Sequence, residues 1–135
     1  MYTFGTTSNR RLETCRPEVR IVMRQAIITS DIDFGIVCGF RGEIEQGMAF
    51  VGGFSDAKWG ESDHNIMKGN RLCSPAVDVA PYSAELRDYI WDDKELWDYL
   101  HDHITATAKR LHYKMMCGIT LKNGVADLPH CTLVY

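Results

Sequence analysis

Two histidines and one aspartate in this sequence have the residue types of a metal site. His64 lies in a long polar segment, Asp78 interrupts the apolar run 76–80, and His130 comes near the end of the chain. A carboxylate between apolar residues is costly to bury unless a cation or hydrogen-bond donors satisfy it. Two imidazoles and one carboxylate can hold a catalytic Zn²⁺ and leave one position for water. Asp127, three residues before His130, would then be placed to take a proton from that water.

Each of these residues also has a purely structural interpretation, which the spacing leaves open. A lone histidine in a loop, such as His64, is usually solvated, Asp78 could cap a turn at Pro81, and Asp127 could begin a turn. No HExxH or CxxC motif fixes a metal geometry. Arg41, at the end of a predicted strand, is either a solvated charge or a contact for a substrate carboxylate or a hydrolytic oxyanion.

The remaining histidines and cysteines make weaker candidates. His101 and His103 are two residues apart on a predicted helix, so they point to different faces and cannot chelate one ion together. His112 ends that helix, where the dipole favours an imidazolium. Cys73 stays an outside candidate for a metal ligand. Cys131 should face the core, because neighbouring residues of a strand point to opposite faces.

Hydrophobic periodicity predicts the elements that must position these residues. Apolar residues at helical spacing predict helices over 16–30 and 92–111, with a shorter helix over 43–50. Alternation and apolar runs predict strands over 33–41, 76–80 (stopped by Pro81), 113–121 and 131–135. In the first of these strands, alternation places Phe34, Ile36 and Cys38 on one face. Residues 54–72 form a long loop of the kind that is usually functional. This order suggests an α+β domain with a small antiparallel sheet and flanking helices.

Composition limits the class of protein. The chain has 135 residues, which suits a single domain over 1–135, and it is 45% hydrophobic and 24% charged, a globular balance. A net charge of -3 argues against a nucleic-acid binder. No apolar run is long enough for a membrane helix, and the N-terminus has no secretory signal, so we expect synthesis in the cytoplasm. The five scattered cysteines are expected to be reduced thiols.

The order of the motifs resembles a family of zinc peptidases. The D-alanyl-D-alanine carboxypeptidase and L-alanyl-D-glutamate endopeptidase group carries Ser-x-His, Ala-x-Asp and Asp-x-x-His motifs in this order. Similar motifs stand here in the same order: Ser62-x-His64, the run from Ala76 to Tyr82 that contains Asp78, and Asp127-x-x-His130. More narrowly, the chain resembles small phage endolysins of the L-alanyl-D-glutamate peptidase type. Segments 4–19, 33–41 and 130–134 also look like parts of that family, so the resemblance covers nearly the whole chain.

The resemblance implies a zinc cleft on the sheet and a mechanism. It implies Zn²⁺ held by His64, Asp78 and His130, with Asp127 as general base and then general acid. It also implies that Arg41 orients the substrate or steadies the tetrahedral intermediate, and that Ser62 helps to position the peptide. The substrate would be the peptide stem of bacterial peptidoglycan, cut between L-alanine and D-glutamate. We expect a monomer with no separate wall-binding domain, reaching the wall after a holin-type partner permeabilises the membrane.

Two departures from the family pattern and three alternatives accompany this expectation. Residues 65–77 separate the first histidine from the aspartate, where the family commonly has six residues, and Lys68 or Arg71 in this insertion could contact substrate. The tryptophan-rich segment that many relatives carry before the last histidine is replaced by residues 117–120. The alternatives are a D-alanyl-D-alanine carboxypeptidase, a catalytically inactive zinc-containing binding module, and a metal-free structural domain.

Overall fold

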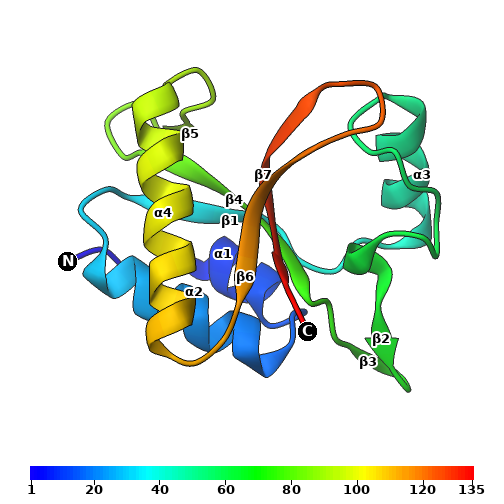
Figure 1. The fold of residues 1–135 in the computed structure, drawn as a ribbon, viewed down its shortest axis with the longest axis horizontal. Coiled ribbons are helices and arrows are strands. Elements are labelled where there is room, and N and C mark those ends of the chain that lie inside the picture. Colours follow the sequence, from blue (N-terminus) through cyan, green and yellow to red (C-terminus); the bar gives the residue numbers. More distant parts are fainter.

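A computed structural model describes residues 1–135 as an α+β fold around one antiparallel sheet (Figure 1). The strand order is β1-β4-β7-β6, and every neighbouring pair is antiparallel. The sheet strands are β1 (Phe34–Cys38), β4 (Ala76–Ser83), β6 (Met115–Thr120) and β7 (Ala126–Leu133), with the short β5 (Asp88–Tyr89) paired to β4. The helices are α1 (Thr6–Leu12), α2 (Pro17–Thr29), α3 (Glu43–Val51) and α4 (Lys94–Arg110). The predicted fold class is confirmed.

Three of the helices build the core against one face of the sheet. The helix α1 contacts β1, α4 contacts β6, and α2 packs on α4. As the periodicity predicts, the apolar stripe of α2 is buried, and α4 buries Trp97, Leu100, Ile104 and Ala108. Val77 and Val79 of β4 face this core, as does Cys131 of β7, which confirms the prediction for that cysteine. None of the helices combines the length and the apolar character needed to span a membrane.

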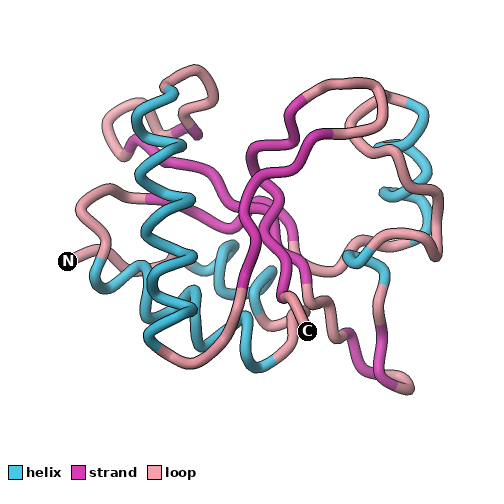
Figure 2. Tube along the Cα trace, in the orientation of Figure 1, coloured by secondary structure: helices cyan, strands magenta, loops and turns pink.

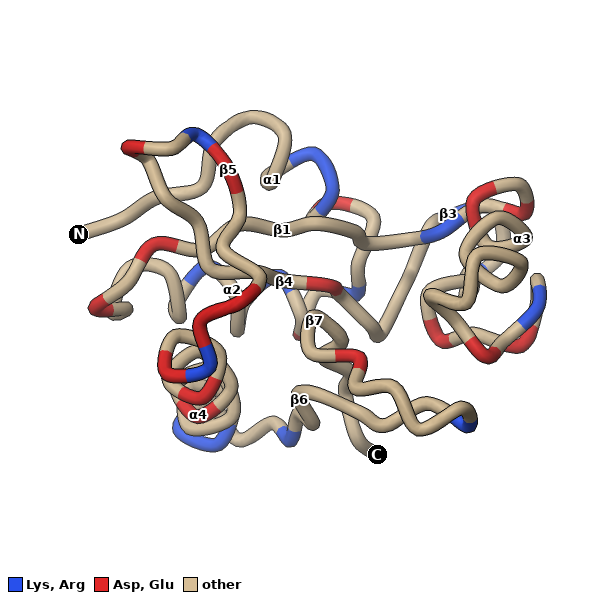
Figure 3. Tube along the Cα trace, turned by 90° about the horizontal axis from the view of Figure 1, so that it is seen from above, with Lys and Arg blue, Asp and Glu red and all other residues tan.

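The helix α3 lies apart from the other three helices, and the chain around it is mostly loop (Figure 2). The segment 54–72, predicted as a loop, contains a 3₁₀ turn, η1 (Asp63–Asn65), and a small hairpin of β2 (Met67–Lys68) and β3 (Arg71–Leu72). Acidic and basic residues are interspersed around the fold (Figure 3), in keeping with the small net charge of -3.

Two predicted strand boundaries are wrong, each for a reason visible in the pairing. The strand β4 continues through Pro81 to Ser83. The neighbouring Tyr82 N–H donates to the carbonyl of Asp33, just before β1, so the nitrogen of Pro81 faces the other side. On that side the pairing of β4 with β7 has already ended at Asp78. A proline there removes no ladder hydrogen bond. The strand β7 begins at Ala126 and not at residue 131, so His130 lies inside the strand.

Candidate metal and active site

Three neighbouring strands place Cys38, Asp78 and His130 in one row across the sheet. Asp78 is the register partner of Cys38 on β1 and of His130 on β7. Since Val77 and Val79 face the helices, strand alternation turns Asp78 to the opposite face. Asp78 and His130 were predicted to meet, and the sheet brings them together.

His64 reaches this row from the turn η1, outside the sheet. Ser62 caps the turn, since its hydroxyl accepts the His64 N–H at 3.2 Å, and the Asn65 side chain accepts the Ser62 N–H at 3.2 Å. The His64 carbonyl accepts the Arg41 N–H at 2.7 Å, which ties the turn to the end of β1. The His64 side chain is only 2% exposed. Ser62, predicted to position substrate, is thus placed beside the site and supports its first histidine.

The three predicted ligands converge on one point. His64 Nε2 lies 3.1 Å from Asp78 Oδ1 and 3.3 Å from His130 Nδ1, and His130 Nδ1 lies 3.7 Å from the same oxygen. His64 Nδ1 lies 2.8 Å from the Gly39 carbonyl. Because a carbonyl only accepts, Nδ1 carries the proton, and in the neutral ring Nε2 turns a lone pair toward the carboxylate. Two acceptors that face each other require a proton or a cation between them.

This donor set fits a zinc ion. Two imidazole nitrogens and a carboxylate oxygen are the protein ligands of many catalytic zinc sites. A backbone carbonyl that orients the ligating histidine through its other ring nitrogen is the usual support of such a ligand. His64 has this support from Gly39. The residues present therefore suit Zn²⁺ in type, number and orientation.

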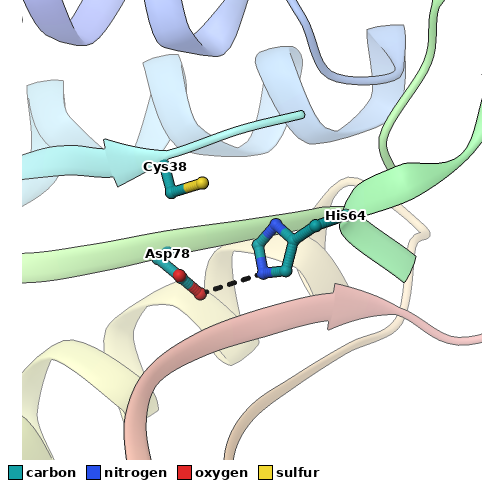
Figure 4. Close-up of side chains that lie close together, drawn as sticks. All are labelled: Cys38, His64 and Asp78. Atoms are coloured by element: carbon teal, nitrogen blue, oxygen red, sulfur yellow. Dashed lines mark hydrogen bonds and ion pairs between the residues drawn. The ribbon is translucent and has the colours of Figure 1, made fainter. Parts of the chain in front are cut away.

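Cys38 also lies close to this point, on the face of the sheet opposite to the one that alternation predicts. Its Sγ, a ring nitrogen of His64 and a carboxylate oxygen of Asp78 all lie within 4.8 Å of one another (Figure 4). Alternation predicted Cys38 on the core face with Ile36, but β1 carries one extra residue between the two, and Val37 packs on the core. This bulge turns Cys38 toward the site. Burial raises the pKa of the Cys38 thiol, and the charge of Asp78 adds to the effect.

Arg41 pairs with the ligand row rather than with solvent. Its guanidinium Nη2 lies 3.1 Å from Asp78 Oδ2, and Nη1 donates to Gln46 Oε1 at 3.1 Å. Burial alone would raise the pKa of Asp78. When a proton occupies the position between His64 Nε2 and Asp78 Oδ1, the charge of His64, hydrogen bonds from both imidazoles and the charge of Arg41 together lower it. Asp78 is therefore an ionised carboxylate with one oxygen on Arg41 and the other on the histidines.

Asp127 lines the same small cleft as Arg41, Ser62, His64 and His130, a space of about 220 Å³. Burial raises the pKa of the Asp127 carboxyl, and the charge of Asp78 raises it further. The pKa of His130 is raised as well: burial would lower it, but its hydrogen bond to Asp78 and the nearby carboxylates outweigh burial. The predicted base and the two predicted histidine ligands thus share one cleft. A larger hollow of about 470 Å³ between α1 and β5 holds no histidine.

A bulge in β7 lets Asp127 and His130 face the same cleft. Between the register pairs 117/131 and 119/127, the single residue Gly118 of β6 faces three residues of β7, from Leu128 to His130. Gly118 has a φ of +77°, which only glycine adopts without strain, and a Cβ there would lie 3.0 Å from the ring of His101. His101 Nε2 donates to the Leu128 carbonyl at 2.7 Å. His101 therefore supports the bulge, a role that its sequence context does not indicate.

The other candidates lie away from the cleft. His103 hydrogen-bonds to Thr29 and Ala26 on α2, so it faces a different direction from His101, as predicted. Cys73 is outside the cluster of potential metal ligands. The β2–β3 hairpin that carries Lys68 and Arg71 is exposed and protrudes from the fold (Figure 1), and neither residue lines the cleft.

Known proteins resemble this chain in sequence and in fold. The family model described as phage L-alanyl-D-glutamate peptidase matches residues 1–130. The L-alanyl-D-glutamate peptidase of Escherichia phage T5 is 28% identical over 143 residues, covering 98% of both chains. The crystal structure of the Serratia marcescens L-Ala D-Glu endopeptidase ChiX has a similar fold, with a TM-score of 0.75 and 22% identity over 98% of this chain and 91% of that chain.

Proposed function

The chain belongs to the phage L-alanyl-D-glutamate peptidase family, and on that premise we propose that it is a zinc-dependent endolysin. Its reaction is hydrolysis of the L-alanyl-D-glutamate bond in the peptide stem of bacterial peptidoglycan. The observation that carries the proposal is the convergence of His64 Nε2, Asp78 Oδ1 and His130 Nδ1. Both histidines line one cleft together with Asp127. We assign His64, Asp78 and His130 as the zinc ligands, and residues 1–135 as one catalytic domain.

Asp127 is the general base and then the general acid in this proposal. Zn²⁺, when bound, supplies Lewis-acid polarisation of the scissile carbonyl and lowers the pKa of the attacking water. Asp127 accepts a proton from that water and delivers it to the nitrogen of the leaving D-glutamate. The environment of Asp127 raises its pKa, which favours the protonated form that the second step needs.

Arg41 and Ser62 prepare the cleft for the substrate. Arg41 keeps Asp78 ionised. Because its guanidinium pairs only with Oδ2 of Asp78, the other carboxylate oxygen, Oδ1, still points to the histidines. The side chain of Arg41 remains 15% exposed at the cleft, so its remaining N–H groups can meet the developing oxyanion. The Ser62 hydroxyl accepts from the backbone of the turn, which leaves its own proton free to donate to the peptide.

The decisive experiment separates proton transfer from metal binding. Asp127→Asn should lower turnover of purified peptidoglycan by about 10² to 10⁴-fold, because it removes the base. It should retain the zinc content of the parent, measured by metal analysis, since Asp127 is not a ligand. His64→Ala should lose the zinc. Asp92→Asn, an exposed carboxylate outside the cleft, is the matched control and should change neither. Loss of zinc in Asp127→Asn, or full turnover without its carboxylate, would contradict the assignment.

The products identify the bond that is cut. Mass spectrometry of digested muropeptides should find peptides that begin with D-glutamate. Release of single D-alanine residues instead would identify a carboxypeptidase, and zinc binding with no product would identify a binding module.

We also propose that the protein acts on the wall as a monomer after the membrane has been permeabilised. Acidic and basic residues are interspersed along the fold (Figure 3). None of its helices is long and apolar enough to cross a membrane. Expression inside a Gram-negative host should lyse cells only when a holin-type permeabiliser is expressed with it. Sedimentation of the purified protein at the mass of one chain, 15.4 kDa, tests the oligomeric state.

A further inference from the structure

Two cysteines that the proposed mechanism does not use face each other across the last two strands. Cys117 of β6 and Cys131 of β7 are direct register partners in an antiparallel pair. Directly opposed residues have Cα atoms about 4.5–5.5 Å apart and side chains on the same face. A disulfide needs Cα atoms about 4.4–6.8 Å apart, so the backbone already has the separation that a bridge requires.

Burial agrees with this pairing. Cys131 is a fully buried member of the core, and Cys117 is partly buried and packs against that core. Both side chains thus point to the face covered by helices, away from the metal ligands. The other three cysteines have no cysteine opposite them: Cys38 pairs with Asp78, Cys15 bridges to Ser74, and Cys73 precedes β4.

We propose that Cys117 and Cys131 form a redox-sensitive modification site, closed to a cross-strand disulfide by a small-molecule or protein disulfide. The partly exposed Cys117 thiolate attacks the oxidant, forms a mixed disulfide and releases one thiol. Cys131 then attacks the Cys117 sulfur and releases the second thiol, so two protein thiols are oxidised and one disulfide is reduced to two thiols. Each protein thiol passes its proton to a released thiolate.

The bridge encloses the part of the chain that holds two site residues. Residues 118–130 lie between the two cysteines, and they include Asp127, His130 and the bulge opposite Gly118. Closure would therefore brace this hairpin. Where the oxidation happens rests on the proposed function: a protein made in a reducing cytoplasm and released to the bacterial wall enters an oxidising compartment. The pairing itself does not depend on that function.

The test is a thiol map of the full chain after equilibration in oxidised glutathione. Trypsin places each of the five cysteines in a different peptide, with Cys117 in 115–122 and Cys131 in 123–135. We expect two thiols fewer than in the reduced protein, an intact mass lower by the two hydrogens lost, and one linked pair of peptides, 115–122 with 123–135. A loop of this length should also raise the thermal midpoint by roughly 5–10 °C relative to the reduced protein.

Two variants control the experiment, and neither requires activity. Cys117→Ser, at the more exposed partner, should keep the fold and abolish both the linked peptides and the thermal shift. Cys73→Ser, at a partly buried cysteine outside the sheet, should retain both. Five free thiols after equilibration, a stable glutathione adduct on Cys117, or a bridge to any other cysteine would overturn the proposal. Because the assay measures thiols, such a failure would leave the proposed peptidase function untouched.

Discussion

Substitution of Gly39 by alanine should damage both stability and metal binding, because two segments meet at this residue. A Cβ at Gly39 would lie 2.3 Å from the Arg11 carbonyl oxygen and 2.3 Å from Thr14 Oγ1. Non-bonded contacts of carbon are favourable near 3.5–4.0 Å, so the end of β1 and α1 must separate by about 1 Å. Overpacking usually costs about 1–3 kcal/mol. The Arg11 carbonyl is a backbone group and cannot rotate away from the new Cβ as a side chain could. We therefore expect the upper end of this range, a loss of about 3 kcal/mol in the unfolding free energy.

The same shift should weaken zinc binding, since the Gly39 carbonyl orients His64 through the 2.8 Å hydrogen bond to Nδ1. Loss of such a support typically lowers metal affinity about 10–100-fold. Urea unfolding in the presence of a chelator measures the first effect, and competition with a chromophoric chelator measures the second. Gly47→Ala is the matched control: it lies in α3 with open space around it, so alanine should stabilise by up to about 1 kcal/mol. A Gly39→Ala protein within about 0.5 kcal/mol of the parent, with unchanged zinc affinity, would refute the reasoning.

Three further predictions use other features of the site. Carboxylate neighbours raise the pKa of His130 despite its burial, so this group stabilises the metal-free protein below its ordinary pKa of 6.5. That contribution disappears as the pH rises through the raised value, so urea unfolding should show stability falling as the pH rises above about 6.5. His130→Gln should lack this part of the pH dependence. Gly118→Ala and Gly124→Ala each place an alanine in a left-handed backbone conformation, but only the alanine at 118 would also contact the ring of His101. The unfolding free energy of Gly118→Ala should therefore fall by about 1 kcal/mol more than that of Gly124→Ala. Equal losses in the two variants would contradict the packing argument. Cobalt-substituted protein should lack a thiolate charge-transfer band, and a band that disappears in Cys38→Ser would instead make that cysteine a ligand.

Local periodicity predicted much of this fold, because it reports which face of an element is buried. The apolar stripe of residues 16–30 is the buried face of α2. In β4, Val77 and Val79 face the core, and the intervening carboxylate of Asp78 points the other way, to His64 and His130, as alternation requires. The motif order that resembles zinc peptidases then selected His64 and His130 among five histidines, and the structure places both at this carboxylate.

What periodicity could not predict arises from pairing between strands. Alternation in 33–41 places Cys38 on the same face as Phe34 and Ile36. Only the register of β1 against β4 reveals the extra residue between Ile36 and Cys38, which turns the Cys38 side chain toward the site. In the same way, Asp127 and His130 are three residues apart, so a regular strand would point them to opposite faces. The bulge opposite Gly118 removes that conflict. The glycine, and the histidine of α4 that packs on it, are therefore needed for the site although neither touches a ligand.

The long insertion between the first histidine and the aspartate shows why spacing alone does not determine the ligand set. His64 is fixed by contacts with residues before it in the chain: its ring is held by the Gly39 carbonyl, and its own carbonyl accepts the Arg41 N–H. Asp78 is fixed by strand register. Neither constraint passes through residues 67–72, so the extra length forms the exposed β2–β3 hairpin without moving either ligand. Shortening that hairpin should accordingly leave zinc affinity unchanged, as long as η1 and the start of β4 are kept.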